Sequence, residues 1–169
     1  MRTLVLGLGN EYAGDDAVGV LAVRALPREL AAGADVVESA ASGLALLEAF
    51  AGYDRAVVVD SIQTGRFPAG TIVEAGLADL GAAKAPSLHQ AGVPELAAVA
   101  RRLGMRFPDR TRVLAVETAG PMTFGAPLSQ PAAAAVAPLS RRVIAQVRHW
   151  AAEDSARDPE DTPHGGPGG

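Results

Sequence analysis

The sequence predicts a single α/β domain, a three-layer sandwich in which helices cover both faces of a mostly parallel five-stranded sheet. Two observations lead to this prediction. Short runs rich in β-branched residues alternate with longer stretches of helical periodicity, as in sheets with helical crossovers. The 169 residues are 49% hydrophobic but only 4% aromatic, so the core must be built from leucine, valine and alanine. This length is enough for one domain with one core.

Five segments are expected to be strands, at 4–9, 35–38, 55–60, 71–75 and 112–117. The connection between the third and the fourth, SIQTGRFPAG, is about ten residues long and rich in turn formers, which is too short for a typical crossover helix. The strand at 71–75 is therefore expected to be antiparallel to its neighbour and to lie at an edge of the sheet.

Helices are expected at 16–30, 43–51, 92–103 and 131–152. The third has the clearest pattern, because an apolar face recurs at helical spacing. That face comprises Leu96, Val99, Ala100 and Leu103. A proline near the start of this segment and a glycine just past its end, Pro94 and Gly104, agree with the chemistry of helix ends.

The last predicted helix, 131–152, presents an apolar stripe to the sheet. The stripe comprises Val136, Leu139, Val143, Val147 and Trp150. Pro138 within this segment is expected to kink the helix. From residue 153 the sequence becomes EDSARDPEDTPHGGPGG, which is acidic and rich in Pro and Gly. Residues 1–152 are therefore predicted to form the domain, and residues 153–169 a disordered tail.

Composition excludes several classes of function. The formal net charge of −4 disfavours nucleic acid as the main partner, because phosphate binding needs an excess of Lys and Arg. The absence of cysteine excludes disulfides, thiolate metal sites and a cysteine nucleophile, so a metal site must use oxygen and nitrogen ligands. The apolar runs are too short for a signal peptide or a membrane span, and a cytoplasmic location is expected.

The opening stretch MRTLVLGLGNEYAGDDAVGV places a glycine turn and two aspartates between the first strand and the first helix. Asp15 is interpreted as a helix cap that accepts backbone N–H groups. A dinucleotide site is disfavoured, because Tyr12 stands where the third glycine of the fingerprint belongs. Asp16 would also put a carboxylate where a pyrophosphate should lie, which reverses the charge preference of a helix N-terminus.

Two further residues are candidates for a site with Asp16. Asp60 ends a predicted central strand, at the sheet edge where ligands gather in open α/β folds, and His89 lies in the loop before the third helix. Taken singly, Asp60 could be a turn residue and His89 a surface residue. Together they could form an oxygen and nitrogen site for Ni²⁺ or Zn²⁺. The two carboxylates could instead act as general acid and base without a metal.

The chain resembles the endopeptidases that mature the large subunit of nickel-iron hydrogenases. The resemblance is carried by GLGNEYAGDDAVGV, AVVVDSIQTGRFPAG, SLHQAG and PMTFGAPLSQPAAAAV, in order up to about residue 150. It implies a twisted sheet flanked by helices. It also implies that Asp16, Asp60 and His89 are the metal-binding and catalytic residues.

The resemblance implies removal of a C-terminal extension from the hydrogenase large-subunit precursor once nickel has been inserted. The precursor would be the partner and would supply the nickel, with no organic cofactor, and the enzyme is expected to be a monomer. The peptide hydrolysis would be of the aspartic or the metal-assisted type. A covalent acyl-enzyme is disfavoured, because the chain has neither cysteine nor a G-x-S-x-G motif.

Two alternatives stay open. Where that family usually has an acidic residue followed by Gly-Gly-Thr, this chain reads Glu38-Ser39-Ala40-Ala41-Ser42-Gly43, and a nickel-sensing or hydrogenase-binding factor without activity fits that departure. Peptidyl-tRNA hydrolases also begin with a strand and GLGN. They continue with Pro-Gly and an early catalytic histidine, whereas this chain has Glu11-Tyr12 and no histidine before His89.

Overall fold

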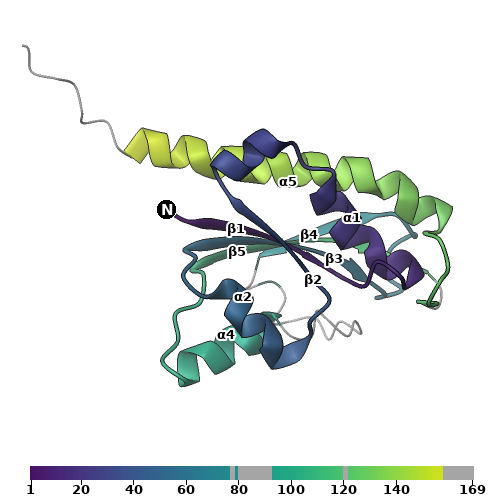
Figure 1. The fold of residues 1–169 in the computed structure, drawn as a ribbon, viewed down its shortest axis with the longest axis horizontal. Helices are drawn as coiled ribbons and strands as arrows, with labels where there is room; N and C mark the ends of the chain where they lie inside the picture. Colours follow the sequence, from purple (N-terminus) through teal and green to yellow (C-terminus); the bar gives the residue numbers. More distant parts are fainter. Residues whose placement is uncertain (77–78, 80–92, 120–121, 158–169) are drawn as a thin grey trace, which may run out of the picture.

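The computed structural model describes residues 1–76, 79, 93–119 and 122–157. Its five strands form one sheet of order β2-β1-β3-β5-β4 (Figure 1). They are β1 (Thr3–Leu8), β2 (Asp35–Ser39), β3 (Arg55–Ile62), β4 (Ile72–Gly76) and β5 (Arg110–Glu117). Strand β4 is antiparallel to β5 at one edge, and the other pairs are parallel. All five predicted strands and the antiparallel edge are confirmed.

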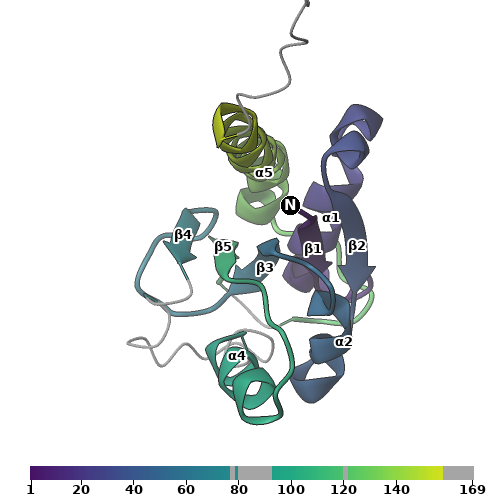
Figure 2. The same cartoon turned by 90° about the vertical axis from the view of Figure 1, so that its left-hand side faces the viewer.

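Helices cover both faces of the sheet, which confirms the three-layer arrangement (Figures 1 and 2). Helices α1 (Val18–Arg24) and α5 (Gln130–Arg157) lie on one face, and α2 (Leu47–Phe50) and α4 (Val93–Arg102) on the other. Short 3-10 helices occur at η1 (Gly14–Ala17), η2 (Arg28–Ala32) and η3 (Gly43–Leu46). None of the helices in the described part of the chain has both the length and the hydropathy of a membrane span.

The predicted continuous helix at 16–30 is wrong. The segment divides into η1, α1 and η2, and α1 ends at Arg24. The cause is Pro27, which has extended backbone and disfavours helical conformation at the residue before it. The apolar periodicity of the segment does not reveal this break.

The core has two halves because successive side chains of a strand point to opposite faces of the sheet. Val5, Val57 and Val59 pack with α1 and α5, whereas Leu4, Leu6 and Val58 pack with α2 and α4. The predicted apolar stripe of α5 is buried from Leu139 to Trp150, and α5 continues through Pro138. The assignment of Leu103 to the apolar face of α4 is wrong, because α4 ends one residue earlier and this side chain is 65% exposed.

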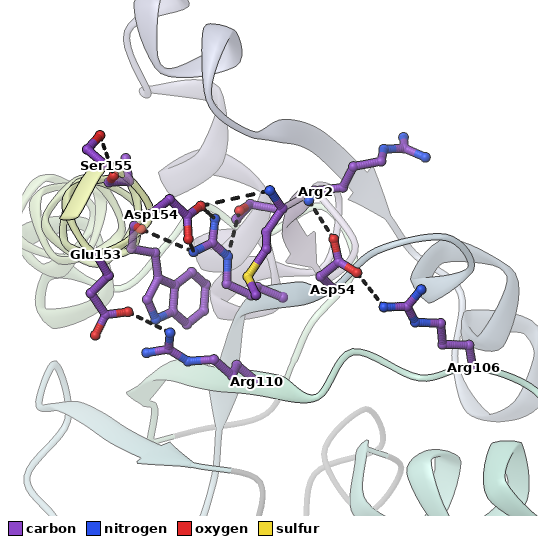
Figure 3. Close-up of polar contacts among 12 residues, drawn as sticks. Arg2, Asp54, Arg106, Arg110, Glu153, Asp154 and Ser155 are labelled. Atoms are coloured by element: carbon purple, nitrogen blue, oxygen red, sulfur yellow. Dashed lines mark hydrogen bonds and ion pairs between the residues drawn. The ribbon is translucent and has the colours of Figure 1, made fainter. Parts of the chain in front are cut away.

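Helix α5 continues five residues beyond the predicted end of the domain, because two acidic side chains pair with the sheet. The buried Arg55 guanidinium donates to both carboxylate oxygens of Asp154, at 3.1 and 2.7 Å. Arg110 donates to Glu153 at 2.5 Å (Figure 3), and both guanidiniums lie over the Trp150 ring. Residues 153–157 are therefore helical rather than part of a tail, and the rest of the predicted tail lies outside the described residues.

Candidate functional site

Two glycines allow the loop after β1 to pack closely against its surroundings. Gly9 has a φ of 131°, and a Cβ there would lie 1.8 Å from the Asp16 carbonyl oxygen. A Cβ on Gly19 would lie 2.4 Å from the carbonyl oxygens of both Leu8 and Val59. Side chains at either position would push η1 and α1 away from the ends of β1 and β3. The glycines thus bring Asp16 close to the sheet edge.

The structure places Asp16 and Asp60 at the carboxyl ends of neighbouring parallel strands. Asp16 is 4% exposed, and its Oδ2 accepts the Asn10 N–H at 2.7 Å. Asp60 lies in β3 and is fully buried, with its Oδ1 accepting the Ser61 N–H at 2.8 Å. The Ser61 hydroxyl donates to Asp16 Oδ1 at 3.4 Å. Ser61 therefore links the two carboxyl groups that the sequence motifs selected.

The environment of Asp60 favours its protonated form. Burial is the main cause that raises its pKa, the Ser61 N–H opposes the shift and the nearby charge of Asp16 adds to it, and the net result is a pKa of about 8. Desolvation acts in this direction because it penalises the charged form of a carboxyl group. At neutral pH the pair therefore includes a neutral carboxyl group, which can donate a proton.

The third predicted site residue, His89, lies outside the described residues. Within the described ranges, no three His, Asp or Glu side chains are close enough together to hold a metal ion. The set of two oxygen ligands and one nitrogen ligand therefore stays a prediction, of which the described structure contains the two carboxyl groups.

The interpretation of Asp15 as the cap of its own helix is wrong. No side chain caps η1, and the Asp15 carboxylate instead accepts the Ser129 N–H at 2.6 Å and its hydroxyl at 2.8 Å. Ser129 immediately precedes α5. Asp15 thus ties the loop after β1 to the start of the last helix, a partner too distant in sequence for local patterns to indicate.

Sequence reasoning missed a third buried acid at the same sheet edge. Glu117 ends β5 and is 1% exposed. Its carboxylate accepts the N–H groups of Thr64 and Gly65, at 2.7 and 2.8 Å, and the Thr64 hydroxyl at 2.5 Å. It thereby fixes the loop after β3. RVLAVE ends in an acid just as RAVVVD does, and this parallel could have identified it.

Ion pairs hold Glu38, the acidic residue of β2 that precedes the segment departing from the family pattern. Arg24 donates to both oxygens of Glu38 at 2.9 Å and to Glu11 at 2.6 Å. A hollow of about 170 Å³ lies here, bounded by Gly9, Tyr12 and this charged group among others. A larger hollow of about 660 Å³ lies at the amino end of β5 and includes neither Asp16 nor Asp60.

No protein-family model matches the chain, but sequence comparison finds similar proteins that share one description. The chain is 29% identical over 161 residues to the hydrogenase expression/formation protein HupD of Rhizobium leguminosarum bv. viciae, covering 92% of this chain and 79% of that protein. It is also 29% identical over 160 residues to the protein of the same name from Bradyrhizobium diazoefficiens, with coverages of 92% and 83%.

Two solved structures share this fold. The hydrogenase maturating endopeptidase HybD of E. coli superposes with a TM-score of 0.71 at 26% identity, over 88% of this chain and 93% of that one. The [NiFe] hydrogenase maturation protease HybD of Thermococcus kodakarensis gives 0.66 at 25% identity, over 87% and 99%. The resemblance indicated by the sequence motifs is therefore confirmed in both sequence and fold.

Proposed function

We propose that this chain, a relative of the hydrogenase maturation endopeptidases in sequence and fold, cleaves the C-terminal extension from a nickel-iron hydrogenase large-subunit precursor after nickel insertion. The observation that carries the proposal is the position of Asp16 and Asp60. They are buried at the carboxyl ends of neighbouring parallel strands and linked through Ser61. Ligands bind at this edge in open α/β sheets.

In this proposal the nickel arrives as part of the precursor. Asp16 and Asp60 supply carboxylate oxygens to it, and His89 is the expected nitrogen ligand, a mixture suited to a borderline divalent ion. Nickel bound in this way positions the scissile peptide only in precursors that have received their metal. An unloaded precursor lacks this anchor and is spared.

Hydrolysis requires that water attack the carbonyl carbon, that the C–N bond break and that the leaving nitrogen receive a proton. In an aspartic-type reaction Asp60 stays protonated and donates that proton, and the nickel is then held by Asp16 and His89 without Asp60. In a metal-assisted reaction the carboxyl groups ligate the nickel, which polarises the carbonyl or activates the water. Cleavage that declines as Asp60 loses its proton above about pH 8 supports the aspartic type. Cleavage sustained there supports the metal-assisted type.

The test is a processing assay followed by mass spectrometry. Purified protein is mixed with the large-subunit precursor from the same organism, with and without inserted nickel. The expected result is nickel-dependent loss of a C-terminal peptide, abolished in a folded Asp16→Asn variant and retained in Asp109→Asn, an exposed aspartate outside the site. Complex formation without a change in mass would instead identify a non-catalytic binding factor. In either case we propose that the protein acts as a monomer in the cytoplasm.

A further inference from the structure

Two aromatic side chains stand exposed on the loops around the candidate site. Tyr12 is 60% exposed and Phe124 is 76% exposed. Their ring centroids are 6.0 Å apart and their planes are inclined by 42°. The other aromatic pair in the described residues joins Phe107 to the buried Phe50 and belongs to the core. Paired exposed rings are typical of surfaces that bind a partner.

The loops that carry the Tyr12–Phe124 pair are fixed by hydrogen bonds of the backbone. Gly125 donates its N–H to the Tyr12 carbonyl at 2.6 Å, and the Tyr12 N–H donates to Asn10 Oδ1 at 3.0 Å. The Asp15 carboxylate holds Ser129 near the end of the second loop. The rings are therefore presented on an ordered base, so these loops lose less conformational entropy when a partner binds.

The pair is continuous with the candidate site. Asn10, which accepts the Tyr12 N–H through its side chain, donates its own N–H to the Asp16 carboxylate. Tyr12 also borders the 170 Å³ hollow that extends to Ser39 at the end of β2. A peptide whose scissile bond lies at Asp16 and Asp60 would therefore pass beside these rings.

We propose that the Tyr12–Phe124 pair is a docking surface for an apolar side chain of the large-subunit precursor, beside the bond to be cleaved. This proposal rests on the proposed function of the site. The neighbouring Arg24 is paired with two glutamates, Glu11 and Glu38, which leaves this group with an excess negative charge. The residues flanking the docked side chain are therefore neutral or basic, since acidic ones would be repelled.

The test compares wild type with a Tyr12→Ala, Phe124→Ala double variant. Both rings are exposed, the hydrogen bonds that hold the loop are made by the Tyr12 backbone, and the Tyr12 side chain bonds to the exposed Glu11, so the variant is expected to keep the urea midpoint of wild type. Its affinity for nickel-loaded precursor, measured by biolayer interferometry, is expected to fall about tenfold or more. In the cleavage assay KM is expected to rise by a similar factor, with kcat unchanged.

Two matched variants complete the design. Tyr12→Phe keeps both rings and is expected to bind like wild type. Leu103→Ala removes an equally exposed apolar side chain, 65% exposed, just beyond the end of α4, and is expected to bind and cleave normally. Equal affinity of the double variant and wild type would overturn the docking surface while leaving the protease function intact.

The remaining outcomes separate the two proposals. Weakened binding by the double variant, together with no cleavage by wild type, would support the docking surface and refute the protease. If wild type neither binds nor cleaves the precursor, both proposals are wrong. If Leu103→Ala raised KM as much as the double variant does, the docking surface would also be refuted, because both rises would then reflect a general loss of apolar area.

Discussion

Replacing Asp60 by asparagine should make the protein more stable, and increasingly so as the pH rises. Asparagine matches the shape of a protonated aspartate and stays neutral at every pH. In the folded protein the Asp60 carboxyl group keeps its proton up to about pH 8, whereas its ordinary pKa is 3.8. Between these values the folded state binds one more proton than the unfolded state, so wild-type stability declines with rising pH.

The magnitude follows from the shift. One pKa unit corresponds to about 1.36 kcal/mol, so the wild type should lose stability relative to Asp60→Asn by about that amount per pH unit between pH 5 and 7. The slope flattens near pH 8, where the folded carboxyl group ionises. Between pH 5 and pH 8 the difference in unfolding free energy between Asp60→Asn and wild type should grow by about 4 kcal/mol.

The assay is urea denaturation of both proteins at pH 5, 6, 7 and 8 in the presence of a chelator. Other titrating groups are common to both chains and cancel in the difference. Asp54→Asn is the control, because the Arg2 N–H above all lowers the pKa of Asp54. That group changes charge below this interval, and its difference from wild type should stay constant. A flat difference for Asp60→Asn as well would refute the reasoning about burial.

Three further substitutions test other parts of the structure by urea or thermal denaturation. Gly19→Ala should destabilise the protein by about 2 kcal/mol, because its Cβ would meet two carbonyl oxygens at 2.4 Å. The control Gly33→Ala should not, because the nearest atom to its Cβ is 3.9 Å away. Equal melting temperatures of the two variants would contradict the close approach of α1 to the sheet. Asp154→Asn leaves the Arg55 charge, 3% exposed, without its carboxylate and should cost about 3 kcal/mol. The comparison is Asp35→Asn, which breaks an exposed pair with Arg2 and should cost less than about 1 kcal/mol; similar losses would refute burial as the cause. Glu117→Gln should cost about 1 to 2 kcal/mol, because charge-assisted bonds to Thr64 and Gly65 are weakened, and an unchanged midpoint would show that this loop is held by other contacts.

The strands were predictable because their signal is local. Runs such as RAVVVD are buried on both faces of a parallel sheet and read as continuous apolar segments, and the short link before β4 allowed only an antiparallel return. The break at Pro27 is a local effect of proline that the apolar periodicity of the segment hides, whereas the extension of α5 to Arg157 depends on particular contacts. The sequence predicts that Glu153 and Asp154 are solvent-exposed acids. In the structure they pair with Arg110 and Arg55 of the sheet.

The part of the candidate site that lies at the carboxyl ends of strands was predictable. Asp60 ends one apolar run and Asp16 lies in the connection that follows another, and parallel topology brings such strand ends to one edge. The partnership of Asp15 with Ser129 spans 114 residues, and no local pattern specifies it. The exposure of Tyr12 beside Phe124 depends in the same way on two loops meeting in space.

Three acids lie buried at the carboxyl edge of this sheet, and their surroundings distinguish structure from chemistry. Glu117 accepts two N–H groups and a hydroxyl that fix a loop, so its carboxylate supports the fold. The hydrogen bond from the Ser61 N–H does not offset the burial of Asp60, so at neutral pH a neutral side chain of the same shape would support the fold better. A residue that reduces stability while filling its space well is expected where function requires it. At pH 7, opposite signs for Asp60→Asn and Glu117→Gln would therefore identify Asp60 as kept for its chemistry. A loss of stability in both would make Asp60 a second structural acid.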